Sequence, residues 1–458
     1  MGVRDVKQRS FSFAFAASLC VIGALAVTPN IHGSPVIAQG TETAPRGEAG
    51  IAEQGGTELF NDGRAIFRDD TFGDEAFWGG TIKLHQAVEG SALGGVGGGV
   101  SPKTALAVGL KVDMDRLPPA LVDAIKAGKV DLTAPASTIA LLKANAVVGV
   151  VGQFGSSNPH GLTGIGISCA LCHSTVDNAF APGIGHRLDG WPNRDLNVGA
   201  IIDLAPDLSA VQSLLGANRP TVDKVLKSWG PGKFDAELFL DGKPFRPDGK
   251  SAATLIPAAY GLAGVNLHTY TGWGSVPYWN AFVAVLEMHG QGNFTDTRLD
   301  NAKQFPVAAR AHFGHVRHTP DMVTPKLAAL QYYQLSLPAP TAPPSSFDAA
   351  SADRGKTLFD GRAKCMTCHQ APRFTEGGWN MHTGAEIGID NFQADRSPDH
   401  QYRTTPLRGL AASRMKGGFY HDGRYATLND VVAHYNTTFR LGLATSDQND
   451  LVQYLKSL

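Results

Sequence analysis

The first strong pattern along the chain is an apolar run over residues 11–27, which follows three basic residues. A basic start and a short apolar segment are typical of an export signal, and residues 36–38 (Val-Ile-Ala) offer a small-residue cleavage site. We therefore predict a cleavable signal peptide over residues 1–38. An uncleaved anchor is the alternative, although the apolar run is short for a membrane span.

Beyond this segment, apolar positions recur at helical intervals in the first two thirds of the chain. They predict helices over residues 57–67, 117–128, 136–150 and 325–337. The two middle helices are apolar enough to belong to a core. Residues 39–56 are rich in Gly, Thr, Glu and Ala, and they predict a flexible start of the mature chain.

The end of the chain carries the clearest helix signals. Asp348 can cap a helix through residue 359, in which Gly355 allows a close helix contact. Thr427 and Asp430 form a capping-box pattern for a second helix, and Ser446 can cap a third. The residues expected to face inward are Leu428, Val431, Val432 and Tyr435 in the second helix, and Leu451, Tyr454, Leu455 and Leu458 in the third.

Composition narrows the class of protein. Forty Lys and Arg residues face 41 Asp and Glu residues, so the charge is nearly balanced and does not suggest binding to nucleic acid or an anionic membrane surface. The chain has 53 glycines, and only 18% of its residues are charged. Such a loop-rich chain is suited to wrap a large apolar cofactor.

Two pentapeptides carry the strongest chemical signal. In a Cys-x-x-Cys-His run, each thiol can form a thioether with a haem vinyl group and the histidine can bind the iron. A thioredoxin-like redox pair or half of a zinc site would explain two cysteines, but neither requires a histidine directly after them. We therefore expect two covalently bound haem c groups. Their attachment residues are Cys169, Cys172 and His173 for the first, and Cys365, Cys368 and His369 for the second.

The remaining cysteine of the five, Cys20, lies in the predicted signal peptide and leaves none for a structural disulfide. Covalent haem attachment takes place outside the cytoplasmic membrane, so we expect a periplasmic protein. A proline-rich run over residues 338–347 predicts a linker. The expected fold is mainly α-helical, with an enlarged N-terminal haem domain over residues 39–337 and a C-terminal cytochrome c domain over residues 348–458.

The C-terminal part resembles a known family. Arg-Thr-Thr-Pro-Leu-Arg-Gly-Leu from 403, Gly-Phe-Tyr-His-Asp-Gly-Arg-Tyr-Ala-Thr-Leu from 418 and Val-Val-Ala-His-Tyr-Asn from 431 are similar to the bacterial di-haem cytochrome c peroxidases. The same superfamily holds the di-haem enzyme that matures a tryptophan-derived quinone. The match weakens before residue 350, and residues 57–165 and 187–250 have no recognisable counterpart, which indicates a divergent branch.

The resemblance implies iron ligands beyond the two pentad histidines. For the first haem, His186 is similar to a distal histidine of the peroxidases, with His85, His268 and His289 as alternatives. For the second haem, Tyr435 stands where peroxidases carry a methionine and the quinone-maturing enzyme a tyrosine. Met381 and Met415 are the alternatives. His421 resembles a family histidine near the second haem, and we expect it in the haem pocket.

The resemblance also implies residues for catalysis. Glu287, followed by Met288, is similar to the carboxylate above the reactive haem and could move a proton during O–O cleavage. Trp273, or Trp279, could carry an electron between the haems. Calcium is a further candidate cofactor, because Thr404 and Pro406 match the family's calcium-binding turn, although no side-chain ligand is evident.

The function expected from this resemblance is that of a di-haem oxidoreductase of peroxidase type. It would reduce H2O2 or a related oxidant with electrons from a small periplasmic cytochrome c or cupredoxin. A di-haem electron carrier serving a periplasmic dehydrogenase is one alternative. A di-haem oxidase or oxygenase that modifies an organic or protein substrate is the other, and Tyr435 favours it.

Overall fold

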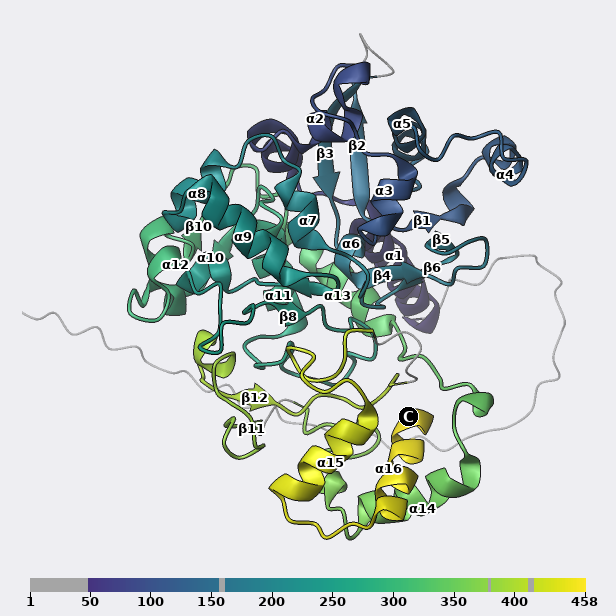
Figure 1. Ribbon diagram of the computed structural model, residues 1–458, viewed down its shortest axis with the longest axis vertical. Coiled ribbons are helices and arrows are strands. Elements are labelled where there is room, and N and C mark those ends of the chain that lie inside the picture. Colours follow the sequence, from purple (N-terminus) through teal and green to yellow (C-terminus); the bar gives the residue numbers. More distant parts are fainter. Residues whose placement is uncertain (1–47, 156–160, 378–379, 411–415) are drawn as a thin grey trace, which may run out of the picture. The chain divides into compact units, whose positions relative to one another are not determined.

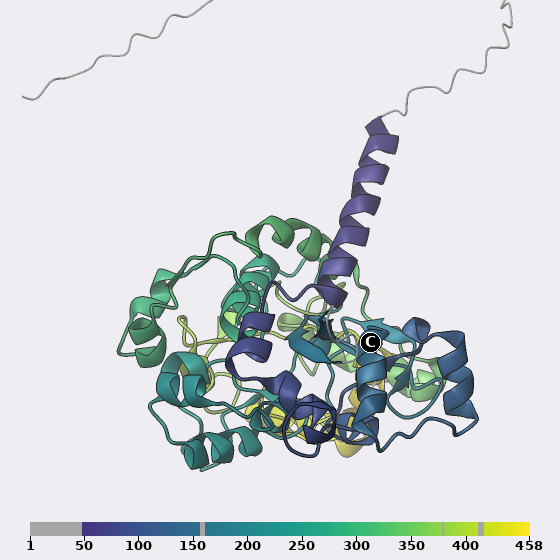
Figure 2. The same cartoon turned by 90° about the horizontal axis from the view of Figure 1, so that it is seen from above.

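The computed structural model describes residues 48–155, 161–377, 380–410 and 416–458, with side chains from residue 54 onward. The predicted signal peptide with Cys20 and the alternative ligand Met415 lie outside these residues. The chain divides after Ala49, and the unit described below is Gly50–Leu458. It is mainly helical, as predicted, with short strands paired two by two (Figures 1 and 2).

The helices before the predicted linker are short for the most part. They are α1 (Glu48–Asp69), α2 (Leu84–Glu89), α3 (Pro102–Ala107), α4 (Pro119–Lys126), α5 (Pro135–Lys143), α6 (Ala170–His173), α7 (Val198–Asp203), α8 (Ser209–Leu215), α9 (Arg219–Trp229), α10 (Leu238–Asp241), α11 (Val276–Phe282), α12 (Pro306–Ala311) and α13 (Leu327–Ser336). The helices after it are α14 (Ala349–Asp360), α15 (Leu428–Thr438) and α16 (Thr445–Ser457). None of the helices in the described ranges is both long and apolar enough to cross a membrane.

The strands form small two-stranded sheets. The antiparallel pairs are β2 (Val150–Phe154) with β3 (Leu162–Ile167), β4 (Ser174–Val176) with β6 (Arg187–Asp189), β7 (Lys233–Phe234) with β8 (Thr254–Leu255), β9 (Phe294–Thr295) with β10 (His315–Val316), and β11 (Met381–His382) with β12 (Tyr402–Arg403). The strands β1 (Val112–Asp113) and β5 (Ile184–Gly185) are parallel.

Several helix boundaries differ from the sequence predictions. Helix α5 ends at Lys143, because the left-handed Asn145 (φ 51°) and the valine-rich stretch after it favour an extended chain. The first helix begins at Glu48, so the predicted flexibility of residues 39–56 is wrong from residue 48 onward. Helix α16 begins before Ser446, and its N-terminal amide at Ala444 donates to the Asp447 carboxylate (3.0 Å).

The hairpin of β2 and β3 delivers the chain to the first pentad. After β3, the Ser168 hydroxyl donates to the backbone carbonyl of Arg68 in α1 (2.7 Å). Gly149 has a φ of 73°, and a Cβ atom there would lie 2.0 Å from the backbone nitrogen of Leu171 in α6. Only glycine fits such a close approach. These contacts fix the first pentad between α1 and the start of β2.

Buried apolar side chains form three clusters. The first extends from Trp78 to Ile256, and the second, from Phe67 to Tyr333, interleaves with it in sequence. The third lies wholly within residues 359–455, where α14, α15 and α16 lie together (Figure 1). A separate third cluster is what a C-terminal haem domain would form, and the division at residues 338–347 stays a prediction.

The C-terminal helices follow their sequence signals closely. Asp348 caps α14 by accepting from the amide of Ser351 (2.6 Å), and Thr427 with Asp430 forms the predicted capping box. The predicted close contact at Gly355 is confirmed, because a Cβ atom there would lie 2.0 Å from the backbone oxygen of Asp450 in α16. The inward faces of α15 and α16 supply buried residues to the third cluster.

Gly355→Ala is therefore expected to lower the free energy of unfolding by about 1–3 kcal/mol, because the added methyl group forces α14 and α16 apart. Denaturant unfolding of the holoprotein measures this loss. Gly98→Ala is the matched control, since a Cβ atom there meets nothing within 4 Å. Equal stability of the two variants would contradict the close packing at Gly355.

Candidate haem-binding site

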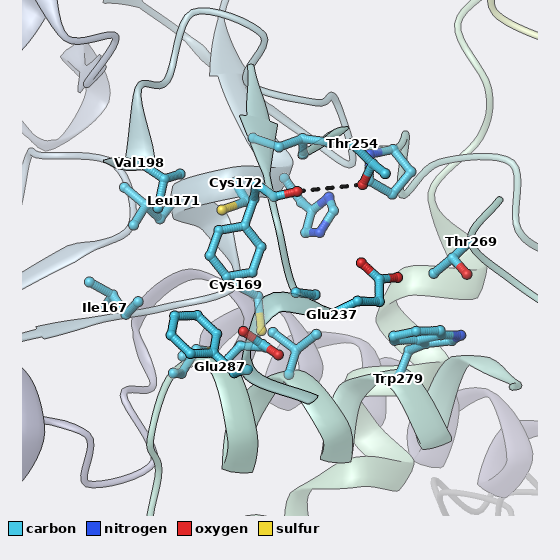
Figure 3. Close-up of a pocket in the computed structure, with 18 of the residues that line it drawn as sticks. Ile167, Cys169, Leu171, Cys172, Val198, Glu237, Thr254, Thr269, Trp279 and Glu287 are labelled. Atoms are coloured by element: carbon cyan, nitrogen blue, oxygen red, sulfur yellow. Dashed lines mark hydrogen bonds between the residues drawn. The ribbon is translucent and has the colours of Figure 1, made fainter. Parts of the chain in front are cut away.

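A cavity of about 500 Å³ lies beside the first pentad, where the first and second apolar clusters meet. Its wall contains Cys169, Cys172 and His173, together with apolar side chains such as Leu171 and Val198 (Figure 3). A mostly apolar space with two thiols and an imidazole at its edge has the chemistry needed to enclose a porphyrin.

His173 closes the short helix α6 and has a neutral ring. Burial lowers the pKa of His173 to about 4, and the nearby Pro257 carbonyl only partly offsets this shift. Its Nδ1 atom is buried without a hydrogen-bond partner. A neutral imidazole is the form that binds iron, so the geometry suits the predicted proximal ligand.

Arg403 adds a positive charge to the same wall. Its guanidinium donates to the backbone carbonyls of Thr269 (2.6 Å) and Leu267 (3.1 Å), and within the described residues it forms no salt bridge with a carboxylate. Burial lowers the pKa of Arg403 to about 10. A buried cation without a counter-ion suits an anionic group such as a haem propionate. The apolar walls, the thiols, the imidazole and this cation together fit a haem.

Glu287 brings an acid into the cavity. It ends the π-helical turn η4 (Val283–Glu287), which continues α11, and it lines the same cavity as Cys169 (Figure 3). Both carboxylate oxygens are buried without a hydrogen-bond partner. Burial raises the pKa of Glu287 well above its usual range, and the charges of Glu237 and Asp235 raise it further. Burial therefore favours the protonated form of Glu287.

The two candidate tryptophans lie in series beside this cavity. Trp279 is part of the wall, whereas Trp273 lies behind it, with the ring centroids 5.7 Å apart. Trp273 is buried and stacks on Phe305 (5.6 Å). The structure thus places Trp279, rather than Trp273, next to the space that fits a haem.

The four histidines considered for the first iron lie in different places. His186 is exposed, its Nδ1 atom lies 2.8 Å from the carboxylate of Asp115, and it is not a wall residue. The structure therefore does not bring it to His173. His85 also lies outside the wall, whereas His268 and His289 belong to it. The His289 ring stacks on Phe77 at 3.6 Å between centroids.

The second pentad begins with the 3-10 turn Cys365–Thr367. The Nδ1 atom of His369 lies 2.9 Å from the Phe374 carbonyl, which leaves Nε2 for an iron. Burial raises the pKa of Tyr435, and nearby Cys368 and Cys365 raise it further. The structure thus brings Tyr435 to the thiols of the second pentad.

The remaining candidates near the second pentad have packing roles. Met381 lies in β11 and packs against Gly272. His421 is buried, and its ring stacks on Tyr402 at 5.3 Å. Its backbone carbonyl accepts from Leu255, which lines the first cavity. His421 thus connects the C-terminal part of the chain with the first haem site.

The predicted calcium turn contacts a carboxylate that the sequence analysis did not identify, that of Glu376. The Thr404 hydroxyl donates to Glu376 (2.7 Å), which also lies 2.8 Å from the Nε2 atom of His382. Glu376, His382 and Cys368 lie close enough together to hold a metal ion, but Cys368 belongs to the second pentad. Calcium at Thr404 and Pro406 stays a prediction.

Sequence reasoning did not assign a role to Arg403 or to Glu237, a second acid in the wall. Glu237 lies in a region without a family counterpart, and Figure 3 shows its carboxylate in the cavity with that of Glu287. The sequence pattern that could have identified Glu237 is a pair of acidic residues, Asp235 and Glu237, inside the apolar run from Phe234 to residue 240.

No family model matches the chain. The methylamine utilization protein MauG of Methylorubrum extorquens is 30% identical over 154 residues, which cover 29% of this chain and 43% of that protein. The cytochrome-c peroxidase IdrP1 of Denitromonas iodatirespirans is 26% identical over 152 residues, covering 24% and 40%. The chain thus spans less than half the length of the curated relatives it matches.

Two solved structures show a weak likeness. One is hydrazine synthase of Kuenenia stuttgartiensis, with a TM-score of 0.27 and 17% identity over 49% of this chain and 86% of that one. The other is a MauG-like protein associated with microbial copper homeostasis, with a TM-score of 0.30 and 16% identity over 51% and 79%. Scores this low carry no structural argument.

The helical fold, the two pentads and the cavity beside the first of them define a haem-binding protein of the cytochrome type. The two curated relatives add a similarity in sequence to this description. Over 29% and 24% of its length, the chain is similar in sequence to MauG and to a cytochrome-c peroxidase, respectively.

Proposed function

We propose that the protein is a periplasmic di-haem c-type oxidoreductase of peroxidase type, which reduces H2O2 or a related oxidant at the first site. Electrons would enter through the second site from a small cytochrome c or cupredoxin. The observation that carries this proposal is Glu287, whose carboxyl oxygens are buried without a partner in the same cavity as the first pentad and whose pKa is raised by burial.

The residues of the first site have separable tasks. A haem bound there supplies a redox-active iron. His173 would bind that iron, the thiols of Cys169 and Cys172 would tether the group, and Arg403 would neutralise a propionate. Glu287 would give its proton to the leaving oxygen of the peroxide, the role of a general acid. The apolar walls exclude water and keep that proton on Glu287.

The test is turnover of the purified holoprotein with H2O2 and a reduced small cytochrome. We expect peroxide-dependent oxidation of the cytochrome. Electron paramagnetic resonance should show a high-spin ferric signal, at rest or after one-electron reduction, that disappears when peroxide is added. Two unchanging low-spin signals without turnover would instead assign the protein to the electron carriers.

The position of Tyr435 favours a second candidate function, the oxidation of an organic or protein substrate. A phenolate ligand would stabilise oxidised iron at the second site. Tyr435→Phe is therefore expected to raise the reduction potential of one haem and leave the other unchanged, as measured by a spectroscopic redox titration. Tyr425→Phe is the matched control, because Tyr425 belongs to the same aromatic group around Tyr420. An unchanged potential in Tyr435→Phe would exclude the phenolate.

A further inference from the structure

Glu237 is the second carboxyl group of the cavity, and its two oxygens differ. Oε1 accepts a hydrogen bond from Nε2 of Gln393 (2.9 Å), whereas Oε2 is buried without a partner. Glu237 is 7% exposed, and Gln393 is 3% exposed. One side of the carboxyl group is thus held in place, and the other is free to exchange a proton.

The cation that acts on Glu237 is Arg396, and it already pairs with other carboxylates. Arg396 bridges Asp235 (2.8 Å) and Asp241 (2.8 Å), and the side chains of all three are fully buried. This one guanidinium is already shared by two carboxylates. Among the described salt bridges, none involves Glu237 or Glu287. Ionising both glutamates beside this network would place unpaired charge in a medium of low polarity.

The charge of Glu237 also acts on Glu287. The charge of Glu237 is the largest electrostatic contribution to the raised pKa of Glu287, after burial. Burial raises the pKa of Glu237 as well, although Arg396 opposes the shift.

We propose that Glu237 is a second proton donor of the first haem site and that it forms a carboxyl pair with Glu287. The proposal rests on the proposed function and deepens it. Reduction of one H2O2 to two water molecules consumes two electrons, supplied by the donor protein, and two protons. Glu287 supplies one proton and Glu237 the other, and solvent protons restore both carboxyl groups afterwards.

Gln393 and Arg396 act as positioning residues for this pair. Both belong to the short segment of residues 393–397, which lies after the predicted linker, whereas the carboxylates they contact precede it. The C-terminal part of the chain thus supplies two of the side chains that position the acids beside the first site.

The experiment uses infrared difference spectra of the full-length holoprotein, recorded when azide binds. Protonated carboxyl groups absorb infrared light at a different frequency from ionised ones. The bands of groups in the cavity should shift when azide binds there. We expect two bands of protonated carboxyl groups in the wild type. Glu237→Gln should remove one and Glu287→Gln the other. Glu58→Gln, at an exposed carboxyl group, should retain both.

A spectrum of Glu237→Gln with both bands would overturn the inference. If that variant does not hold haem, the spectrum of Glu237→Asp is the test. The displaced carboxyl group must shift one band, and an unchanged spectrum overturns the pair.

Peroxide turnover separates the two proposals. If both bands behave as expected but peroxide is not consumed, the pair stands and the peroxidase function fails. If Glu237→Gln consumes peroxide at the wild-type rate, the pair fails and the function stands.

Discussion

Arg396→Met is expected to lower the free energy of unfolding by about 3–5 kcal/mol at neutral pH. The substitution keeps a long apolar side chain but leaves Asp235 and Asp241 as buried charges without a counter-ion. Removing one partner of a buried ion pair is costly for this reason. Denaturant unfolding of the holoprotein measures the loss. Arg362→Met is the control, because Arg362 is 55% exposed in its ion pair with Asp447 and should cost less than about 1 kcal/mol.

The loss in Arg396→Met should depend on pH. Burial already raises the pKa of Asp235 to about 7 in the folded protein, above its ordinary value of 3.8. A carboxyl group with a raised pKa binds its proton more tightly when folded, so its contribution to stability declines as pH rises through about 7. Without Arg396 this pKa rises further. The variant should therefore be least stable above neutral pH and recover towards pH 5. A loss that does not vary with pH would contradict the buried charges as its cause.

Glu287→Gln is expected to lower kcat for peroxide reduction by about 100- to 10,000-fold, the usual contribution of a general acid. Glutamine keeps the size of the side chain and cannot donate a carboxyl proton. Steady-state kinetics with a reduced small cytochrome measure the effect, and KM should change little because the cavity keeps its shape. A kcat within about threefold of the wild type would remove Glu287 from the mechanism.

The wild-type enzyme should also lose activity at high pH. Burial raises the pKa of Glu287, so the active protonated form is lost at a higher pH than for an ordinary glutamate, as pH rises through that raised value. The fall in kcat on the alkaline side should disappear in Glu287→Gln. A fall of the same size in both proteins would show that another group controls it.

The helices of the C-terminal part were predictable because their signals are local. Asp348, Thr427 and Asp430 each act on a backbone amide a few residues away, so the sequence contains both partners. The end of α5 at Lys143 was harder to predict. The valines after Ala146 are apolar enough to belong to a buried helix. They form a strand because they pair with β3, and this partner lies farther along the chain.

The pentads were predictable for the same local reason, but the cavity was not. Its wall takes residues from Phe77 to Arg403, which only the folded chain brings together. Glu237 and Gln393 are far apart in sequence, and neither carries a motif. His186 was singled out by its place after the pentad, yet its ring is held by Asp115 at the surface.

The position of Arg396 also bears on how this protein can be divided. A proline-rich stretch invites the expression of each half alone, but residues 348–458 without their partner would expose a guanidinium that has lost both its carboxylates. In residues 39–337 alone, Asp235 and Asp241 would lose the buried cation that pairs with them. Each half therefore depends on the other for its stability. A chimaera that takes one half from a relative must keep Asp235, Asp241 and Arg396 together.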